Sequence, residues 1–397
     1  RRGSFVEFMV FVNEMGKPIQ QALAEIEKCA LVCEFYAKQG PQFLLDERPT
    51  DAPTHRYITY QPLGVVLAIM PWNFPFWQVF RSAAPALMAG NSLLLKHAAN
   101  VCGCALAIEQ IFVRSGAPSF LFQILLAAGE QASALLQDKR ISMVTLTGSS
   151  DVGKKVAALA GAAMKKGVFE LGGSDPYLIL ADANLSEAAK ICAASRLYNN
   201  GQSCIAAKRF IVVDQVRNRF EHLLVQEMAR AHYKNPMASD CKLGTLAHRG
   251  LREKLHQQVL QSVKRGASLL LGGTLPPGPG FYYPPTVLTN VAPGMPAYDE
   301  ELFGPVAAII PAKNTSVAIR IANDNRYGLG GAIFTQNRRR GERIARNHLE
   351  CGNAFVNECV RSHPALPFGG VRQSGYGREL GAQGLREFMN TKTISIS

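Results

Sequence analysis

Short apolar segments alternate with helix-like segments along this chain, and this alternation constrains the fold more than any other feature of the sequence. In the first half the apolar segments are 64–70, 92–96, 121–126, 142–147 and 167–171. The stretches between them are helix-like. Alternation of this kind is typical of a parallel sheet with helices on both of its faces.

The same alternation continues in the second half of the chain. The apolar segments there are 177–181, 209–213, 305–310, 331–335 and 353–357. Helical patterns fall near 186–198, 217–231, 249–265, 315–323 and 340–348. A chain of 397 residues is also long enough for two or three domains. We therefore expect an α/β fold, with a second α/β domain that begins near residue 173.

Other segments lie outside this alternation. Residues 17–38 have apolar residues on one helical face and predict a helix. Residues 40–61 are polar and contain three prolines, so we expect an excursion from the core, such as a hairpin. Residues 276–285 are rich in glycine and proline and predict a surface loop. The last ten residues, 388–397, alternate and predict a strand.

Composition excludes several classes of protein. Hydrophobic residues make up 47% of the chain and charged residues 18%, as in ordinary soluble proteins, and no apolar run has membrane-spanning length. The net charge of +13 raises the question of nucleic-acid binding, but the basic residues are scattered apart from the run 338–340. We expect neither nucleic acid nor membrane as a partner. The chain begins with Arg1 and has no cleavage-site pattern, so a truncated start explains it better than a signal peptide.

The cysteines indicate a reducing compartment. There are nine, an odd number, and several lie in apolar segments, which favours free thiols and a cytoplasmic protein. Cys102 and Cys104 are too close together for the usual zinc pair, and no second pair follows. We expect no metal site and interpret both as small buried residues.

A glycine turn lies between a strand-like and a helix-like segment at residues 147–153, with the sequence TGSSDVG. Two glycines five residues apart and a following lysine are close to a phosphate-binding loop. However, Lys155 stands where Mg²⁺-nucleotide hydrolases need Ser or Thr, and the three-glycine dinucleotide pattern is absent. The turn alone therefore leaves two interpretations: a phosphate site at a helix N-terminus, or an ordinary tight turn.

Three further residues are candidates for chemistry. Cys204, in the loop sequence NGQSC, is a candidate nucleophile. Glu170 ends an apolar strand before two glycines and is a candidate general base. Asn73 lies between two prolines in PWNFP, where a rigidly held amide suits a developing oxyanion. The alternatives are a buried free cysteine, a strand-end glutamate facing water and a turn asparagine.

Taken together and in order, these stretches resemble the aldehyde dehydrogenase family. The resemblance rests on PWNFP, the strand ending in Lys96, TGSSDVG, ELGG, GQSC, EELFGPV and PFGGVRQSGYGRE. It implies a Rossmann-type cofactor domain (1–39 and 62–172), an α/β catalytic domain (173–372) and a small β oligomerisation element (40–61 and 386–397). It also implies that several tens of residues are missing from the N-terminus, within the cofactor domain.

The resemblance assigns roles to the candidates. Cys204 would attack the aldehyde carbon, Asn73 and the Cys204 backbone N–H would hold the oxyanion, and Glu170 would activate the water that hydrolyses the thioester. The cofactor, NAD or NADP, would be held by residues spread over the chain. They are Trp72, Lys96, Thr147, Gly148, Ser149, Gly153, Leu171, Glu301 and Phe303. An acid three residues after the lysine would repel a 2′-phosphate; Ala99 stands there, which removes a barrier to NADP.

Within the family, the chain is most similar to bacterial succinate-semialdehyde dehydrogenases. Arg81 matches a position that carries an arginine toward a substrate carboxylate, and a guanidinium can pair a carboxylate in two places. The alternative is a helix arginine exposed to solvent. A second arginine found in some relatives is replaced by Tyr198, which we keep as a substrate-side candidate. Ser362 and His363 lie where the family shapes the aldehyde entrance.

The resemblance also implies a homodimer or a tetramer of dimers, joined through the strands at 40–61 and 386–397. Two alternative functions remain open. One is a broad-specificity aldehyde dehydrogenase. The other is a non-catalytic, truncated relative, which the intact Cys204, Glu170 and Asn73 disfavour.

Overall fold

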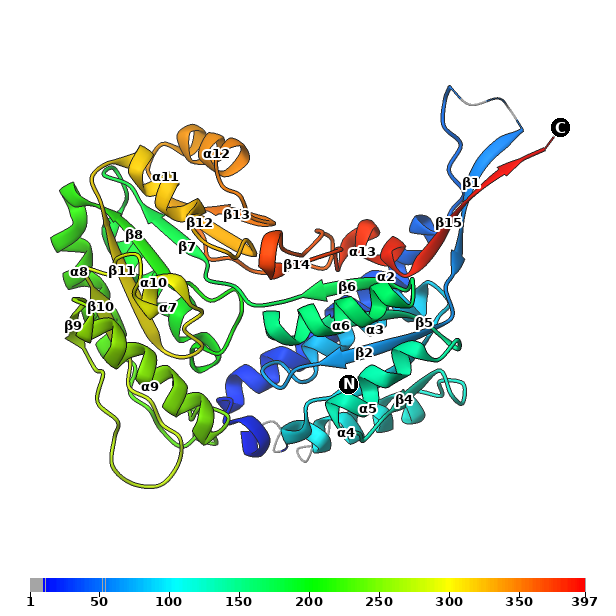
Figure 1. The fold of residues 1–397 in the computed structure, drawn as a ribbon, viewed down its shortest axis with the longest axis horizontal. Helices are drawn as coiled ribbons and strands as arrows, with labels where there is room; N and C mark the ends of the chain where they lie inside the picture. The colour runs from blue at the N-terminus through cyan, green and yellow to red at the C-terminus, as the bar shows by residue number, and fades with distance from the viewer. Residues whose placement is uncertain (1–9, 11, 52, 54, 397) are drawn as a thin grey trace.

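The computed structural model describes residues 10, 12–51, 53 and 55–396. Two lobes lie side by side, each built around its own sheet, and a two-stranded ribbon extends from one of them (Figure 1). Within the described residues, no helix is both long and apolar enough to cross a membrane.

The first lobe contains a six-stranded sheet in the order β14-β6-β5-β2-β3-β4. Its strands are β2 (Val65–Met70), β3 (Ser92–His97), β4 (Phe122–Ile124), β5 (Ile141–Thr147), β6 (Lys166–Glu170) and β14 (Gly375–Tyr376). All neighbours are parallel except the edge strand β14, which runs antiparallel to β6. The strands β2 to β6 are consecutive in the chain, whereas β14 comes from near its C-terminal end.

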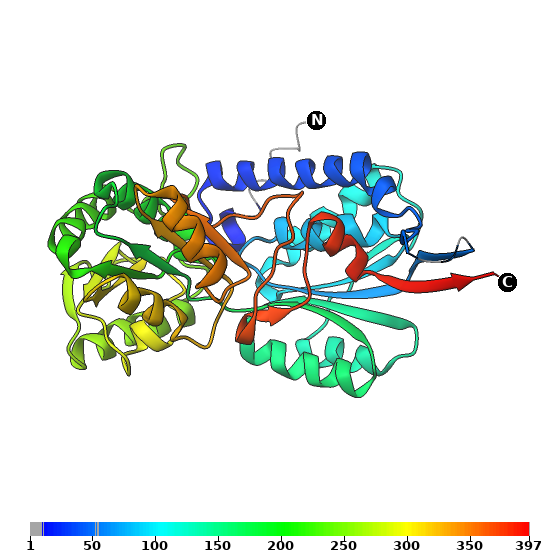
Figure 2. The same ribbon diagram turned by 90° about the horizontal axis from the view of Figure 1, so that it is seen from above.

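Helices cover both faces of this sheet, because both faces are apolar. One face packs against α2 (Ile19–Phe43), α3 (Trp77–Met88), α4 (Cys102–Arg114) and α13 (Gly381–Glu387). The other packs against α6 (Ser150–Ala162) and a short 3-10 turn at 135–137, which follows α5 (Gly129–Ala134). Figure 2 shows α2 running along one side of the molecule and α6 along the opposite side.

The second lobe contains a seven-stranded sheet in the order β13-β12-β7-β8-β11-β10-β9. Its strands are β7 (Pro176–Ile179), β8 (Arg209–Val213), β9 (Ser268–Leu271), β10 (Thr286–Thr289), β11 (Val306–Ala312), β12 (Gly330–Phe334) and β13 (Asn353–Val356). Only β9 is antiparallel to its neighbour. This sheet too is covered on both faces.

One face of the second sheet packs against α7 (Leu185–Leu197) and α8 (Asp214–Ala229). The other packs against α9 (Arg249–Lys264), α10 (Pro296–Asp299), α11 (Thr315–Asn323) and α12 (Arg338–Asn347). The prediction of parallel sheets covered on both faces is confirmed. The chain passes from one sheet to the other between β6 and β7 and returns between β13 and β14; the predicted domain boundaries stay predictions.

The ribbon pairs two segments from opposite ends of the chain. β1 (Arg56–Pro62) runs antiparallel to β15 (Met389–Ser395) over seven residue pairs. The hairpin expected within 40–61 is therefore wrong: β1 pairs with β15, and among the described residues of 40–61 Glu47 and Ile58 form an isolated bridge. Residues 40–43 are also not part of the excursion, because α2 continues through Pro41 to Phe43. Pro41 removes one hydrogen bond from the last turn of the helix, which ends two residues later.

The ten strands predicted from the alternation and the strand predicted at 388–397 are all present, with ends shifted by only a few residues. The sequence analysis missed β9, β10 and β14, which are four, four and two residues long. Segments this short carry too little periodicity to be recognised, and pairing with their neighbours decides their structure.

Candidate active site

Cys204 lies in the loop between α7 and β8, at the junction of the two lobes. The backbone just before it is unusual: Asn199, Asn200 and Gly201 all have positive φ, at 52°, 57° and 74°. Non-glycine residues rarely adopt this region, and such strain gathers at functional sites. We call residues 199–207 the cysteine loop. It presents a half-buried Cys204 to a cleft of about 1200 Å³, open mouth included, which we call the main cleft.

Asn73 reaches the same cleft from the loop after β2, and it is buried. Its side-chain Nδ2 donates a 3.1 Å hydrogen bond to the backbone carbonyl of Gln202. In return, Nδ2 of Asn199 donates to the backbone carbonyl of Asn73 at 2.7 Å. The loop that carries Asn73 and the cysteine loop are therefore tied together. An amide has two N–H donors, and the described residues give a partner to one, so the other can serve an oxyanion.

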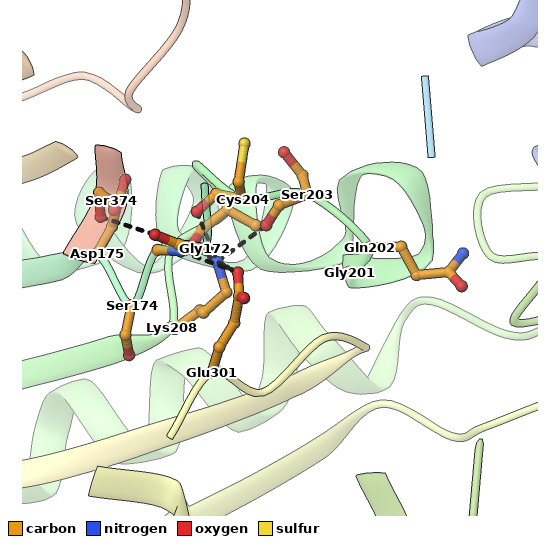
Figure 3. Close-up of polar contacts among 12 residues, drawn as sticks. Gly172, Ser174, Asp175, Gly201, Gln202, Ser203, Cys204, Lys208, Glu301 and Ser374 are labelled. Atoms are coloured by element: carbon orange, nitrogen blue, oxygen red, sulfur yellow. Dashed lines mark hydrogen bonds and ion pairs between the residues drawn. The ribbon is translucent and has the colours of Figure 1, made fainter. Parts of the chain in front are cut away.

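Lys208 holds the cysteine loop from inside the protein. Its buried Nζ donates hydrogen bonds to the backbone carbonyls of Ser203 (2.9 Å), Cys204 (2.7 Å) and Ala206 (3.3 Å). It also lies 3.6 Å from the carboxylate of Glu301. Figure 3 shows the ammonium group between these carbonyls and Glu301, with the Cys204 sulfur pointing away from it. One cation thus holds the backbone of Cys204 and also pairs with Glu301, a second residue of the main cleft.

The surroundings of Cys204 keep its thiol protonated in the absence of ligands. Burial raises its pKa to about 12, although the charges of Arg81 and Lys208 favour the thiolate. The carboxylates of Glu170 and Glu301 act in the same direction as burial. A nucleophilic thiolate at neutral pH therefore needs a base that takes the proton.

Glu170 ends β6 and is buried, so the alternative of a glutamate facing water is wrong. Neither of its oxygens has a hydrogen-bond partner in the part of the chain that the structure describes. Burial, with the nearby Glu379 second, raises its pKa to about 8, against the opposing charges of Arg81 and Arg378. A side chain on Gly369 would come within 2.9 Å of Glu170 Oε1, so the carboxylate packs against that glycine. Glu170 is not among the residues that line the main cleft.

Arg81 is buried on α3, so the alternative of a solvent-exposed helix arginine is also wrong. Its Nε forms an ion pair with Glu379, and its Nη2 donates to Thr147 Oγ1 at 3.2 Å. The guanidinium lies 5.1 Å from the ring centre of Phe368. Arg81 is therefore held by partners within the protein, and it is not among the residues that line the main cleft.

Most of the predicted cofactor residues line the main cleft together with Cys204 and Asn73. They are Trp72, Thr147, Gly148, Ser149, Leu171, Glu301 and Phe303. Trp72 and Phe303 meet edge to face at 5.8 Å. Ser149 caps α6, accepting a hydrogen bond from the N–H of Val152, and the positive end of this helix borders the cleft.

Two predicted cofactor residues do not line this cleft. Lys96 lies near the end of β3. Gly153 lies in the first turn of α6, where an added Cβ would come within 2.3 Å of the Leu171 side chain. The glycine thus allows α6 to pack closely on Leu171, which does line the cleft.

The predicted substrate residues lie outside the lining of the main cleft. Tyr198 is 43% exposed and stacks on Phe74 with ring centres 5.8 Å apart. Ser362 accepts a 2.8 Å hydrogen bond from Lys28 Nζ on α2, and His363 is exposed. None of these residues lines the main cleft.

One smaller expectation is wrong. Cys104 is buried, but Cys102 is only partly buried, because it starts α4 and faces the helix end. Its Sγ donates a 3.2 Å contact to the carbonyl of Ala99.

Comparison with known proteins gives a consistent result. Residues 7–394 match the aldehyde dehydrogenase family. A probable succinate-semialdehyde dehydrogenase [NADP(+)] of Synechocystis sp. is 48% identical over all of this chain and 87% of that protein. The succinate semialdehyde dehydrogenase [NAD(P)+] of Escherichia coli is 47% identical over 97% of this chain and 83% of that protein.

Solved structures agree in fold. The succinic semialdehyde dehydrogenase of Streptococcus pyogenes in complex with NADP+ superposes with a TM-score of 0.96. It is 36% identical, over 98% of this chain and 86% of that one. The chain belongs to the aldehyde dehydrogenase family, which confirms the resemblance and the predicted fold class.

The sequence analysis missed three charged residues around the site: Lys208, Glu379 and Lys28. Glu379 stands in a stretch that carried the resemblance, GYGRE, and Lys208 follows GQSC closely, yet a motif does not say which way a side chain points. Lys28 lies on the helix predicted over 17–38, of which only the apolar face was interpreted. A single sequence contains no signal for the contacts of these three residues, because their partners are far away along the chain.

Proposed function

We propose that this protein oxidises succinate semialdehyde to succinate with NAD or NADP as the hydride acceptor. The observation that carries the proposal is the convergence of Cys204, Asn73 and the cofactor residues on one cleft of a family member. The names of the relatives supply the substrate: those of Synechocystis and E. coli are both called succinate-semialdehyde dehydrogenases.

The residues of the main cleft suit a dinucleotide. The N-terminus of α6, with Ser149, favours the charge of a pyrophosphate, and Glu301 offers a carboxylate to ribose hydroxyls. Ala99 leaves no acid to repel a 2′-phosphate, which supports the use of NADP as well as NAD. When bound, the nicotinamide accepts the hydride.

The chemistry then follows from this chain's own groups. The Cys204 sulfur attacks the aldehyde carbon as its thiol proton passes to Glu170, which then releases the proton to solvent. The second N–H of Asn73 and the Cys204 backbone N–H hold the oxyanion that forms. Collapse of this adduct expels a hydride and leaves a thioester on Cys204. Glu170 takes a proton from the water that attacks the thioester, which releases the acid and the thiol.

The test is an absorbance assay for the reduced cofactor. We expect a higher kcat/KM for succinate semialdehyde than for butyraldehyde with either cofactor. Cys204→Ala abolishes turnover, and Asn73→Ala lowers kcat by roughly 10²–10³-fold. Cys102→Ala, at a partly buried cysteine remote from the cleft, serves as the matched control. An active Cys204→Ala variant would contradict the assigned nucleophile, and equal rates with both aldehydes would leave a broad-specificity enzyme.

Assembly and location are also proposed. The β1–β15 ribbon projects from the first lobe and exposes most of β15, which supports a dimer, or a tetramer of dimers, joined through it (Figure 1). Light scattering that finds only monomer at micromolar concentration would contradict this. Nine cysteines without a disulfide among those described support a cytoplasmic location, which cell fractionation can check.

A further inference from the structure

His97 contacts both ends of the segment that carries Asn73. It is the last residue of β3 and lies beside Met70, the last residue of β2. Its ring Nε2 lies 2.8 Å from the backbone carbonyl of Pro75, and its Nδ1 lies 3.2 Å from the backbone carbonyl of Met70. We call residues 71–75 the amide loop. One buried imidazole ring therefore spans this loop, from the residue before it to its last residue.

The groups around the His97 ring determine which nitrogen carries the proton. The carbonyl of Pro75 can only accept a hydrogen bond, so Nε2 donates to it. Nδ1 then accepts the backbone N–H of Ala98 at 3.0 Å. Burial lowers the pKa of His97, so the ring is neutral at neutral pH and has the single N–H that this arrangement requires. Both nitrogens thus have a partner, and the ring is held in one orientation.

The backbone of the amide loop is held through its carbonyl groups. Its first and last residues are prolines, which have no N–H to donate. From the cysteine loop, Nδ2 of Asn199 donates to the carbonyl of Asn73 at 2.7 Å. From the neighbouring strand, His97 makes the corresponding contact with the carbonyl of Pro75. The loop is therefore tied to both lobes, and His97 provides the tie within the first lobe.

A carboxylate on α2 holds the chain directly after the amide loop. Oε1 of Glu25 accepts the backbone N–H groups of Phe76 and Trp77, each at 2.9 Å, where α3 begins. N–H groups at a helix start have no partner within the helix, so this carboxylate replaces one. The start of α3 is thus fixed independently of His97. A change at His97 should therefore move the amide loop and leave α3 in place.

The amide of Asn73 can be no better placed than the loop that carries it. An oxyanion donor has to lie about 2.7–3.1 Å from the oxygen on which charge develops. A misplacement of about 1 Å, caused by a residue far from the chemistry, can lower a rate ~100-fold. His97 is not among the residues that line the main cleft, whereas Asn73 is. Any effect of His97 on the reaction has to pass through the loop.

We propose that His97 is a positioning residue for the oxyanion donor: by holding the carbonyl of Pro75, its imidazole sets the direction of the Asn73 amide. The inference rests on the proposed role of Asn73. It concerns the carbonyl group that all aldehydes share and is independent of which aldehyde the enzyme prefers.

The experiment is a double-mutant cycle of His97→Leu and Asn73→Ala, at saturating NADP, with succinate semialdehyde and with butyraldehyde. Leucine is close to histidine in size but has no hydrogen-bonding group in its side chain. We expect His97→Leu to lower kcat roughly 10- to 100-fold with both aldehydes and to leave the KM of NADP within about twofold. In the Asn73→Ala background it should lower kcat less than about twofold, because the group through which it acts is already gone.

Two further variants complete the comparison. His97→Gln is the conservative variant, since the N–H of its side-chain amide can donate to Pro75 in place of the ring Nε2. It should recover most of the kcat that His97→Leu loses. His232→Leu is the matched control, because His232 is an exposed histidine in the segment after α8. It should leave kcat unchanged.

The outcomes that overturn the inference are distinct. If His97→Leu lowers kcat by the same factor with and without Asn73, His97 only stabilises the fold. A wild-type kcat in His97→Leu also overturns the inference, and so does a change confined to the KM of NADP, which would mark support of the neighbouring Lys96. If Asn73→Ala itself keeps the wild-type kcat, the proposed role of Asn73 fails and the inference fails with it.

A second measurement uses the wild-type protein and does not depend on the folding of His97→Leu. The protein is labelled with nitrogen-15 histidine, and the ring signals of His97 are identified by their loss in His97→Gln. We expect the chemical shifts of the neutral tautomer with its proton on Nε2. A proton on Nδ1, or exchange between the two tautomers, would remove the hydrogen bond to Pro75 and overturn the inference.

Discussion

The substitution Lys208→Met tests whether one buried ammonium group sets the geometry of the nucleophile. It removes three hydrogen bonds to the backbone carbonyls of Ser203, Cys204 and Ala206, and it leaves Glu301 without its cation at 3.6 Å. Breaking a buried charge interaction by removing one partner typically costs ~3–5 kcal/mol. With an unfolding entropy of roughly 2.1 cal/mol/K per residue over the whole chain, the melting temperature should fall by about 4–6 °C.

Activity should fall by more than the loss of stability explains. With its carbonyl released, the Cys204 backbone is free to shift, and a misplacement of about 1 Å can reduce a rate ~100-fold. We expect kcat to drop roughly 10- to 100-fold at temperatures where the variant is fully folded. Steady-state kinetics and calorimetry on the same preparations measure the two effects.

A third readout is specific to the charge of Lys208. This charge lowers the pKa of Cys204, so its removal raises the pKa further, and alkylation of Cys204 by iodoacetamide at a fixed pH should become slower. Lys208→Arg should retain much of the rate. Lys264→Met, at an exposed lysine near the end of α9, is the control. The reasoning is refuted if Lys208→Met is alkylated at the wild-type rate and keeps kcat within twofold.

Two further predictions follow from the site and its packing. Glu170 has a raised pKa of about 8, so its carboxyl group is protonated below that pH, and the rate of thioester hydrolysis should increase as the pH rises through 8. The substitution Glu170→Gln should slow thioester hydrolysis ~10²–10⁴-fold. It should also give a burst of reduced cofactor in stopped-flow measurements. A burst-free Glu170→Gln enzyme with normal kcat would exclude Glu170 as the base. Gly153→Ala should destabilise the protein by ~1–3 kcal/mol and raise the KM of the cofactor, because the added methyl group meets Leu171. Gly161→Ala, in open space on the same helix, should stabilise the protein by ~0.5–1 kcal/mol. Chemical denaturation measures both effects, and equal effects would show that the contact with Leu171 is unimportant.

The sequence by itself determined the order of the elements and supplied the candidates for the reaction. Apolar segments with helical stretches between them can bury their surface only as parallel sheets covered on both faces, so the strands at 65–70 and 209–213 were predictable from pattern alone. Cys204 and Asn73 were recognised through an ordered set of motifs that resembles the aldehyde dehydrogenase family, because each motif alone left a structural alternative open.

Only the tertiary structure decided which charges pair. Glu170 was equally compatible with a position in water, and Arg81 with an exposed helix face, until packing buried both. Lys208 and Glu301 are 93 residues apart, and Lys28 and Ser362 are 334 apart. The physical reason is that the interaction of two charges depends on their distance in space and on the effective dielectric constant around them, which burial lowers. The number of residues between them in the chain specifies neither quantity. Local patterns therefore predict elements and motifs, whereas partners and pKa values depend on how the two lobes and α2 come together around the cysteine loop.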